Sequence, residues 1–300
     1  MVNKNIYANL LVQFEKFFKH NRQGSFKTRQ RYKEAFKRFL HFLALEFRLE
    51  RIANISPKHV AAYVAHLEGQ WRSPAYIKTE LSAIRFFHDQ IPNAKNKLPD
   101  NAALNLQKRQ YGRTDRTWSG REFNLFVSKA IELNREDYAT IFCLARYAAL
   151  RLHECFRIDT QIAANAVKAG SITIKGKGGL VRTVPVNLSI EIELKKMLAV
   201  TPRGYKLFVN TDDKTHLAMQ RFEEFIRRNK SAIQDSGSMR PMTFHGLRHT
   251  CAVEWYKGYI ESGDSEFQAR KKVAKLLGHG RDDVARIYLA SFRKGGDADG

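Results

Sequence analysis

Residues 171–186 read SITIKGKGGLVRTVPV, and this stretch decides the fold class because its apolar residues follow the period of a strand. Ile172 and Ile174 alternate with polar neighbours, as in a half-buried strand. The glycine-rich turn that follows leads into a second apolar run at 181–186, which is the pattern of a β-hairpin. We therefore expect two short strands, with Lys177 at the hairpin tip.

The rest of the chain shows apolar residues at helical spacing on both sides of this hairpin. In the first hundred residues, for example, Phe36, Phe39, Leu40 and Leu43 recur at helical intervals. Helices are predicted near 5–20, 26–48, 56–69, 74–91, 120–133, 138–149, 189–199, 216–232, 243–258, 267–277 and 283–292. The predicted fold class is therefore mainly α with a small β-sheet, an α+β fold.

The helical spacing is interrupted between Ile91 and Arg116 by proline, asparagine and basic residues. A chain of 300 residues is long enough for two ordinary domains, each with its own core. We predict a helical domain at 1–95, a basic linker at 96–116 and a second domain at 117–300.

The composition is strongly basic, with 52 Lys and Arg against 30 Asp and Glu and a formal net charge of +22. Both parts of the chain share this charge, +13 for residues 1–116 and +9 for residues 117–300. Such a charge suits a polyanion, and nucleic acid is the first candidate. A membrane surface is the alternative, but no segment has the length of a spanning helix and the first residues lack the layout of a signal peptide. We expect a cytoplasmic, nucleoid-associated protein with no membrane contact.

The sequence HGLRH follows Thr243, a residue type that often caps a helix. His245, Arg248 and His249 then fall at i, i+3 and i+4 on one helix face, near an N-terminus that attracts phosphate. Two histidines four residues apart also match a zinc site, but Gly246 stands where a metalloprotease has its catalytic glutamate. The motif favours phosphate chemistry over zinc, with ordinary surface polar residues as the third alternative.

Four further residues have an ordinary explanation when each is considered alone. Arg151 is spaced to pair with Glu154 three residues later. Lys177 lies on a glycine-rich turn, where a lysine is ordinarily exposed to solvent. His279 fits a helix-terminus cap, and Tyr288 fits a core aromatic.

The order of these residues changes their interpretation. An arginine, a lysine on a β-hairpin, a His-x-x-Arg pair, a Leu-Gly-His triplet and a tyrosine nine residues later resemble the tyrosine recombinase, or phage integrase, family. The matching residues are Arg151, Lys177, His245, Arg248, His279 and Tyr288. The resemblance covers the whole chain, since that family carries a helical, SAM-like core-binding domain ahead of its catalytic domain. It assigns 1–95 to DNA binding and 117–300 to catalysis.

Two departures from the family pattern concern local loop geometry and subfamily. Family members often have glycine two residues before the first arginine, where this chain has Ala149. The segment 261–270 resembles an insertion. His249 matches a frequent family residue, for which we expect a supporting role.

The resemblance implies that Tyr288 attacks the scissile phosphate, forms a 3′-phosphotyrosine and expels a 5′-hydroxyl, so that rejoining needs no ATP. Arg151 and Arg248 would stabilise the negative charge of the transition state. A tyrosine phenol is protonated at neutral pH, and His245 is the best candidate to accept its proton. Lys177 would protonate the leaving oxygen.

By the same resemblance, His279 would hydrogen-bond the phosphate. The sequence shows no acidic cluster to hold Mg²⁺, so we expect no metal and no other cofactor. The expected partners are double-stranded DNA with specific recombination sites and further copies of the chain in a homotetramer; accessory DNA-bending proteins are compatible with this scheme. A non-catalytic DNA-binding or architectural protein and a type IB topoisomerase are the alternatives.

Overall fold

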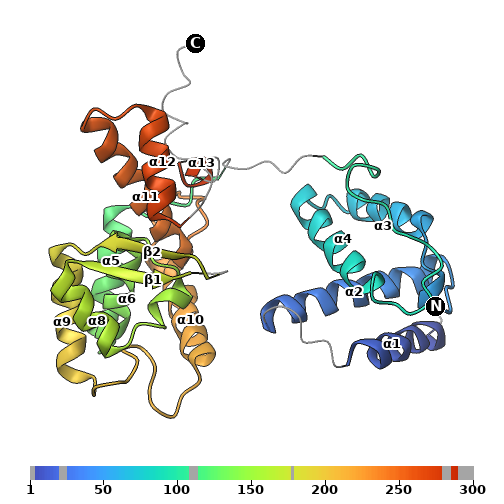
Figure 1. Ribbon diagram of the computed structural model, residues 1–300, viewed down its shortest axis with the longest axis horizontal. Helices are drawn as coiled ribbons and strands as arrows, with labels where there is room; N and C mark the ends of the chain where they lie inside the picture. Colours follow the sequence, from blue (N-terminus) through green and yellow to red (C-terminus); the bar gives the residue numbers. More distant parts are fainter. Residues whose placement is uncertain (1–3, 20–25, 108–113, 177–178, 279–284, 290–300) are drawn as a thin grey trace. The chain divides into compact units, whose positions relative to one another are not determined.

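The computed structural model describes residues 4–19, 26–107, 114–176, 179–278 and 285–289. The chain divides into two compact units, Met1–Gln110 and Tyr111–Gly300 (Figure 1). Most of the regular structure in the described residues is helical, and the described sheet has two strands. The predicted fold class, mainly α with a small β-sheet, is confirmed.

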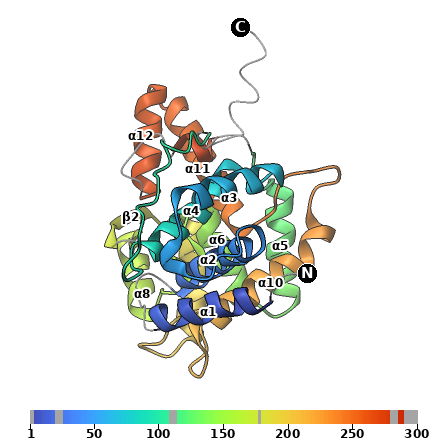
Figure 2. The same ribbon diagram turned by 90° about the vertical axis from the view of Figure 1, so that its right-hand side faces the viewer.

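The described part of the first unit is a bundle of four helices around an aromatic and aliphatic core. Its elements are α1 (Lys4–Phe18), α2 (Phe26–Glu46), the 3₁₀ turn η1 (Ile52–Asn54), α3 (Pro57–Gly69) and α4 (Pro74–His88). α2 lies between α1 on one side and α3 and α4 on the other, and it contacts all three (Figure 2). In the core, the ring of Phe14 lies 5.0 Å from those of Phe36 and Phe87. The four helices agree with the predicted ones.

The second unit combines helices with the two-stranded sheet. Its described elements are α5 (Gly120–Glu132), α6 (Glu136–Ala148), α7 (Leu152–Cys155), α8 (Thr160–Ala169), β1 (Ser171–Lys175), β2 (Val181–Pro185), α9 (Leu188–Val200), α10 (Thr215–Ile233), α11 (Phe244–Glu261), α12 (Glu266–Leu276) and α13 (Ala285–Tyr288). α6 is the central helix, because it contacts α5, α9 and α11 and most of its side chains are buried. β1 packs on α8 and β2 contacts α12, so the hairpin lies between these two helices (Figure 1).

The hairpin agrees with the strand prediction and contains one unexpected side chain. β1 and β2 are antiparallel, with Ile172 opposite Val184 and Ile174 opposite Arg182. These four residues are buried, whereas their neighbours along each strand are more exposed. Arg182 therefore lies on the inward face of the hairpin, at a position where the alternation of buried and exposed residues in a strand predicts an apolar side chain.

Two described helices, α7 and α8, are absent from the sequence prediction. At the start of α8, the side chain of Asp159 accepts a hydrogen bond from the amide of Ile162, and at its end Gly170 takes a φ of +60°. Both are ordinary helix signals. The buried residues Thr160, Ala163 and Ala166 recur at intervals of three, so the helical period is present in the sequence, although small side chains carry it. Of the predicted helix at 283–292, α13 represents the described part.

Candidate active site

Ala149 ends α6 and directs the chain toward Arg151. It is fully buried and has a φ of +50°, in the left-handed region that glycine adopts most easily. This conformation explains why glycine suits the position and shows that alanine is accommodated there in this chain. Two residues later, Arg151 precedes the first residue of α7.

Arg248 on α11 contacts the ends of α6 and α12 and also α13. Its side chain is almost fully buried, and its two Nη atoms donate to the carbonyl oxygens of Ala149 and Leu277. Its Nε donates to Tyr288 Oη at 3.4 Å. Burial first, and the nearby charge of Arg151 next, lower the pKa of Arg248 to about 10, so the guanidinium stays cationic at neutral pH.

Tyr288 lies among the predicted site residues of α11. Its ring centroid is 4.5 Å from that of His249 and 5.6 Å from that of His245, and Cζ of Arg248 lies 5.6 Å from it. Tyr288 is also 6% exposed and packs in an apolar cluster that includes Leu277. Tyr288 therefore packs as a core aromatic residue and also lies beside the HGLRH motif.

The two histidines of the motif differ in environment. His245 is exposed, whereas His249 is buried, and their rings lie 5.2 Å apart. Burial first, and then the charges of His245 and Arg116, lower the pKa of His249 to about 3. His249 is therefore neutral at neutral pH and presents an uncharged ring to Tyr288.

Gly246 lets the start of α11 approach the segment before α5. A Cβ atom at Gly246 would lie 2.2 Å from the carbonyl oxygen of Arg116 and 2.7 Å from Nε1 of Trp118. The same indole donates to the carbonyl oxygen of Thr243 at 2.9 Å. Thr243 occupies the N-cap position, as predicted, but its side chain makes no capping hydrogen bond. The position that a metalloprotease fills with glutamate thus has no room for a side chain.

Arg151 makes the ion pair that its spacing with Glu154 predicts. Arg151 Nη1 donates to Glu154 Oε1 at 2.9 Å, and the Arg151 amide donates to Oε2 at 2.7 Å. Arg182 binds the same carboxylate in a bidentate fashion, at 2.8 and 2.7 Å. Burial alone would raise the pKa of Glu154, but hydrogen bonds from Arg182 and from the Arg151 amide lower it to about 2. Glu154 is therefore a buried anion between two arginines.

Sequence reasoning did not identify Arg182 as part of the site. Its signal was available in the alternation of VRTVP, which puts Arg182 on the same strand face as Val184. A charge on an inward strand face requires a buried partner, and that partner is Glu154.

Two predicted site residues, Lys177 and His279, lie outside the described residues. The positions before them are described. The Gly176 amide donates to the carbonyl oxygen of Leu180 at 2.8 Å, which closes the hairpin, and Gly278 follows α12 with a φ of +68°.

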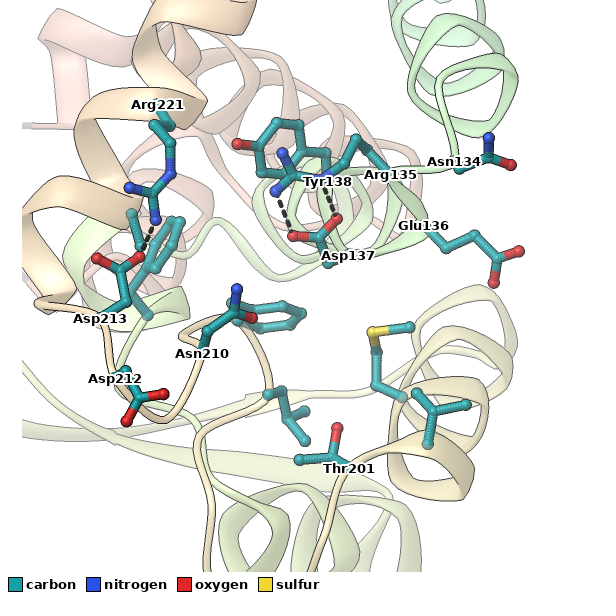
Figure 3. Close-up of a pocket in the computed structure, with 16 residues that line it drawn as sticks. Asn134, Arg135, Glu136, Asp137, Tyr138, Thr201, Asn210, Asp212, Asp213 and Arg221 are labelled. Atoms are coloured by element: carbon teal, nitrogen blue, oxygen red, sulfur yellow. Dashed lines mark hydrogen bonds and ion pairs between the residues drawn. The ribbon is translucent and has the colours of Figure 1, made fainter.

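A cavity of about 810 Å³ lies in the same unit but away from these residues (Figure 3). It borders the N-terminal end of α6, whereas Ala149 and Arg151 follow the C-terminal end, about 20 Å along the helix. Figure 3 shows that charged side chains at this cavity pair with one another, Arg135 with Asp137 and Arg221 with Asp213. The cavity is not part of the cluster around Tyr288.

Across the described residues, no helix is both long and apolar enough to cross a membrane.

Comparison with known proteins gives two family matches. The phage integrase family model matches residues 121–294, and the model of the phage integrase N-terminal SAM-like domain matches residues 11–91. A curated relative, tyrosine recombinase XerD of Halalkalibacterium halodurans, is 25% identical over 305 residues, covering 93% of this chain and 92% of the relative.

Solved structures share the fold. A lambda integrase dimer bound to a COC′ core site has a TM-score of 0.65 at 17% identity, covering 99% of this chain and 82% of that chain. A lambda integrase tetramer bound to a Holliday junction has a TM-score of 0.60 at 18% identity, covering 93% and 75%.

The fold, the cluster around Tyr288 and these matches define the class of protein as a tyrosine site-specific recombinase. The chain belongs to the phage integrase family. The matches favour neither a non-catalytic architectural protein nor a type IB topoisomerase.

Proposed function

We propose that Tyr288 is the nucleophile with which this recombinase cleaves and rejoins double-stranded DNA through a covalent 3′-phosphotyrosine. The observation that carries the proposal is the position of Tyr288, with its Oη 3.4 Å from the buried cation Arg248 and its ring against His245 and His249. A fixed cation beside the phenol oxygen is suited to draw a phosphate to it. The transfer replaces one phosphodiester with another, so that rejoining consumes no cofactor.

The remaining residues divide the work of this transfer. Arg151 and Arg248 stabilise the negative charge on the non-bridging oxygens, because guanidinium donors fixed before the reaction need no reorganisation during it. His245, exposed beside Tyr288, accepts the phenol proton. His249, neutral and buried, supports the phenol ring.

Lys177 and His279 complete the proposed set. Lys177 protonates the leaving 5′-oxygen, and His279 hydrogen-bonds the phosphate. Both roles come from the family resemblance, and the local support is sequence position, one residue after Gly176 and one after Gly278.

The proposed partners are double-stranded DNA with specific recombination sites and further copies of the chain. A net charge of +22 supports the first, and a lambda integrase tetramer on a Holliday junction supports a homotetramer. Residues 1–95 would bind DNA, 96–116 would act as a basic linker, and 117–300 would carry catalysis. Such a protein would act in the cytoplasm with the nucleoid, where accessory DNA-bending proteins are compatible with its work.

The test uses nicked duplexes that trap the covalent intermediate, because the short fragment released beside the nick diffuses away and cannot rejoin. A pool of such duplexes covering the DNA on both sides of the gene is incubated with the full chain, and adducts are counted after denaturation. Tyr288→Phe should abolish the adduct and keep non-covalent DNA binding. Tyr256→Phe, which removes a hydroxyl from the same apolar cluster, is the control and should keep the adduct. An undiminished adduct in Tyr288→Phe would overturn the proposal.

A further inference from the structure

Arg182 is the buried charge that the proposed mechanism does not use. It is 7% exposed and occupies a strand position whose neighbours on the same face, Ile174 and Val184, are apolar. Burying a guanidinium is costly unless its charge and donors are matched. Both of its Nη atoms bind Glu154, whose side chain has no exposed surface.

Arg182 also changes the electrostatics of Arg151. Glu154 alone would hold Arg151 in place and cancel its charge. With Arg182 on the same carboxylate, the three groups keep a net positive charge, and the carboxylate is shared between two cations at 2.7 to 2.9 Å. Glu154 can then orient Arg151 without repelling a phosphate.

Arg182 contacts the chain beside two more predicted site residues. A Cβ atom at Gly278, the residue before His279, would lie 3.0 Å from Arg182 Cδ. A Cβ atom at Gly176, the residue before Lys177, would lie 3.7 Å from Arg182 Nη1. The shaft and head of one arginine thus pack against the backbone at both places.

We propose that Arg182 is a positioning residue of the strand-transfer site, which offsets the charge of Glu154 and so lets that carboxylate align Arg151 on the scissile phosphate. Arg182 itself does not touch DNA. This role rests on the proposed function, since it concerns the rate at which Tyr288 forms its adduct.

The test measures the single-turnover rate constant of adduct formation on the nicked duplex trapped by the wild-type chain. Non-covalent DNA affinity and the final amplitude are measured in parallel. Arg182→Met should lower the rate constant about tenfold to a hundredfold, the range expected when a catalytic group is misplaced, with affinity nearly unchanged. Arg182→Lys should fall between, because lysine restores the charge without the bidentate geometry. Adding Glu154→Gln to Arg182→Met should recover part of the rate, since the unbalanced anion is then removed.

The matched control is Arg135→Met. Arg135 also makes a bidentate pair with a carboxylate, Asp137, but at the opposite end of α6. Its rate constant should equal that of the wild type.

Three outcomes would overturn the role of Arg182. A loss of amplitude at an unchanged rate constant in both Arg182 variants would mean a purely structural residue. A loss of DNA affinity in proportion to the rate would mean direct contact with DNA. No recovery in the double variant would remove the electrostatic argument. Absence of a Tyr288-dependent adduct in the wild type would refute the proposed function itself, and this role with it.

Discussion

Replacing Gly246 with alanine tests the close approach that sets the start of α11. The new Cβ would lie 2.2 Å from the Arg116 carbonyl oxygen and 2.7 Å from Trp118 Nε1. The nearest atom belongs to the backbone, so relief requires moving the segment or the helix. Overpacking of this kind costs about 1–3 kcal/mol, and loss of the bond from Trp118 to Thr243 costs about 1 kcal/mol. The higher helix propensity of alanine offsets about 1 kcal/mol of this loss, because glycine is the less favourable residue in a helix.

The expected net loss for Gly246→Ala is therefore about 2 kcal/mol, or about 4–8 °C in the unfolding temperature of a unit of this size. Calorimetry of the full chain measures it. Gly258→Ala is the matched control, because Gly258 lies on the same helix and a Cβ atom added there would meet nothing within 4 Å beyond the adjacent backbone of that helix. That variant should gain up to about 1 kcal/mol. A Gly246→Ala protein that unfolds at or above the wild-type temperature would refute the packing argument.

Three further predictions concern stability. Glu154→Gln should lower the free energy of unfolding by about 3 kcal/mol at neutral pH; since the folded pKa of Glu154 is about 2, this difference should shrink as pH falls below about 4.5, measured by urea unfolding across pH. The pKa of His249 near 3 means that the unfolded chain protonates first, so stability should fall by about 2 kcal/mol between pH 6.5 and 5, and His249→Phe should flatten that slope. Gly170→Ala should lower the free energy of unfolding by about 1 kcal/mol, because a φ of +60° is strained for a residue with a Cβ atom. Gly69→Ala, where φ is not positive, should not have this cost. Equal melting temperatures of the two variants would contradict this.

The sequence predicted most of the helices because apolar residues recur at helical spacing or, in α6, form a nearly continuous apolar run. α2, α6 and α10 lie within a few residues of their predicted limits, and the hairpin follows from its alternation. The prediction missed α8, whose four alanines are divided between buried and exposed positions, although its polar residues Gln161, Asn165 and Lys168 are all exposed. The Asp159 cap and the Gly170 end are two further helix signals in the sequence.

The candidate site was predictable as a set of residues and not as a set of contacts. The order of Arg151, His245, Arg248 and Tyr288 identified the family, because each residue recurs in a recognisable local setting. The alternation of VRTVP places Arg182 on the inward face of β2, but does not identify its partner Glu154, which lies 28 positions earlier and is reached only when β2 packs into the core. Burial converts an ordinary ion pair into a part of the site.

The hydrogen bond from Arg248 to the Leu277 carbonyl oxygen bears on the segment 261–270, which resembles an insertion. That segment forms the end of α11, the turn through Gly263 and the start of α12. Leu277, at the far end of α12, is fixed to Arg248 and packs in the same apolar cluster as Tyr288. Residues added between α11 and α12 can therefore lengthen the turn that joins the two helices, while the C-terminal end of α12 stays bonded to Arg248. Arg248 sets the position of the chain at Leu277, just before Gly278, and the number of residues in the loop does not.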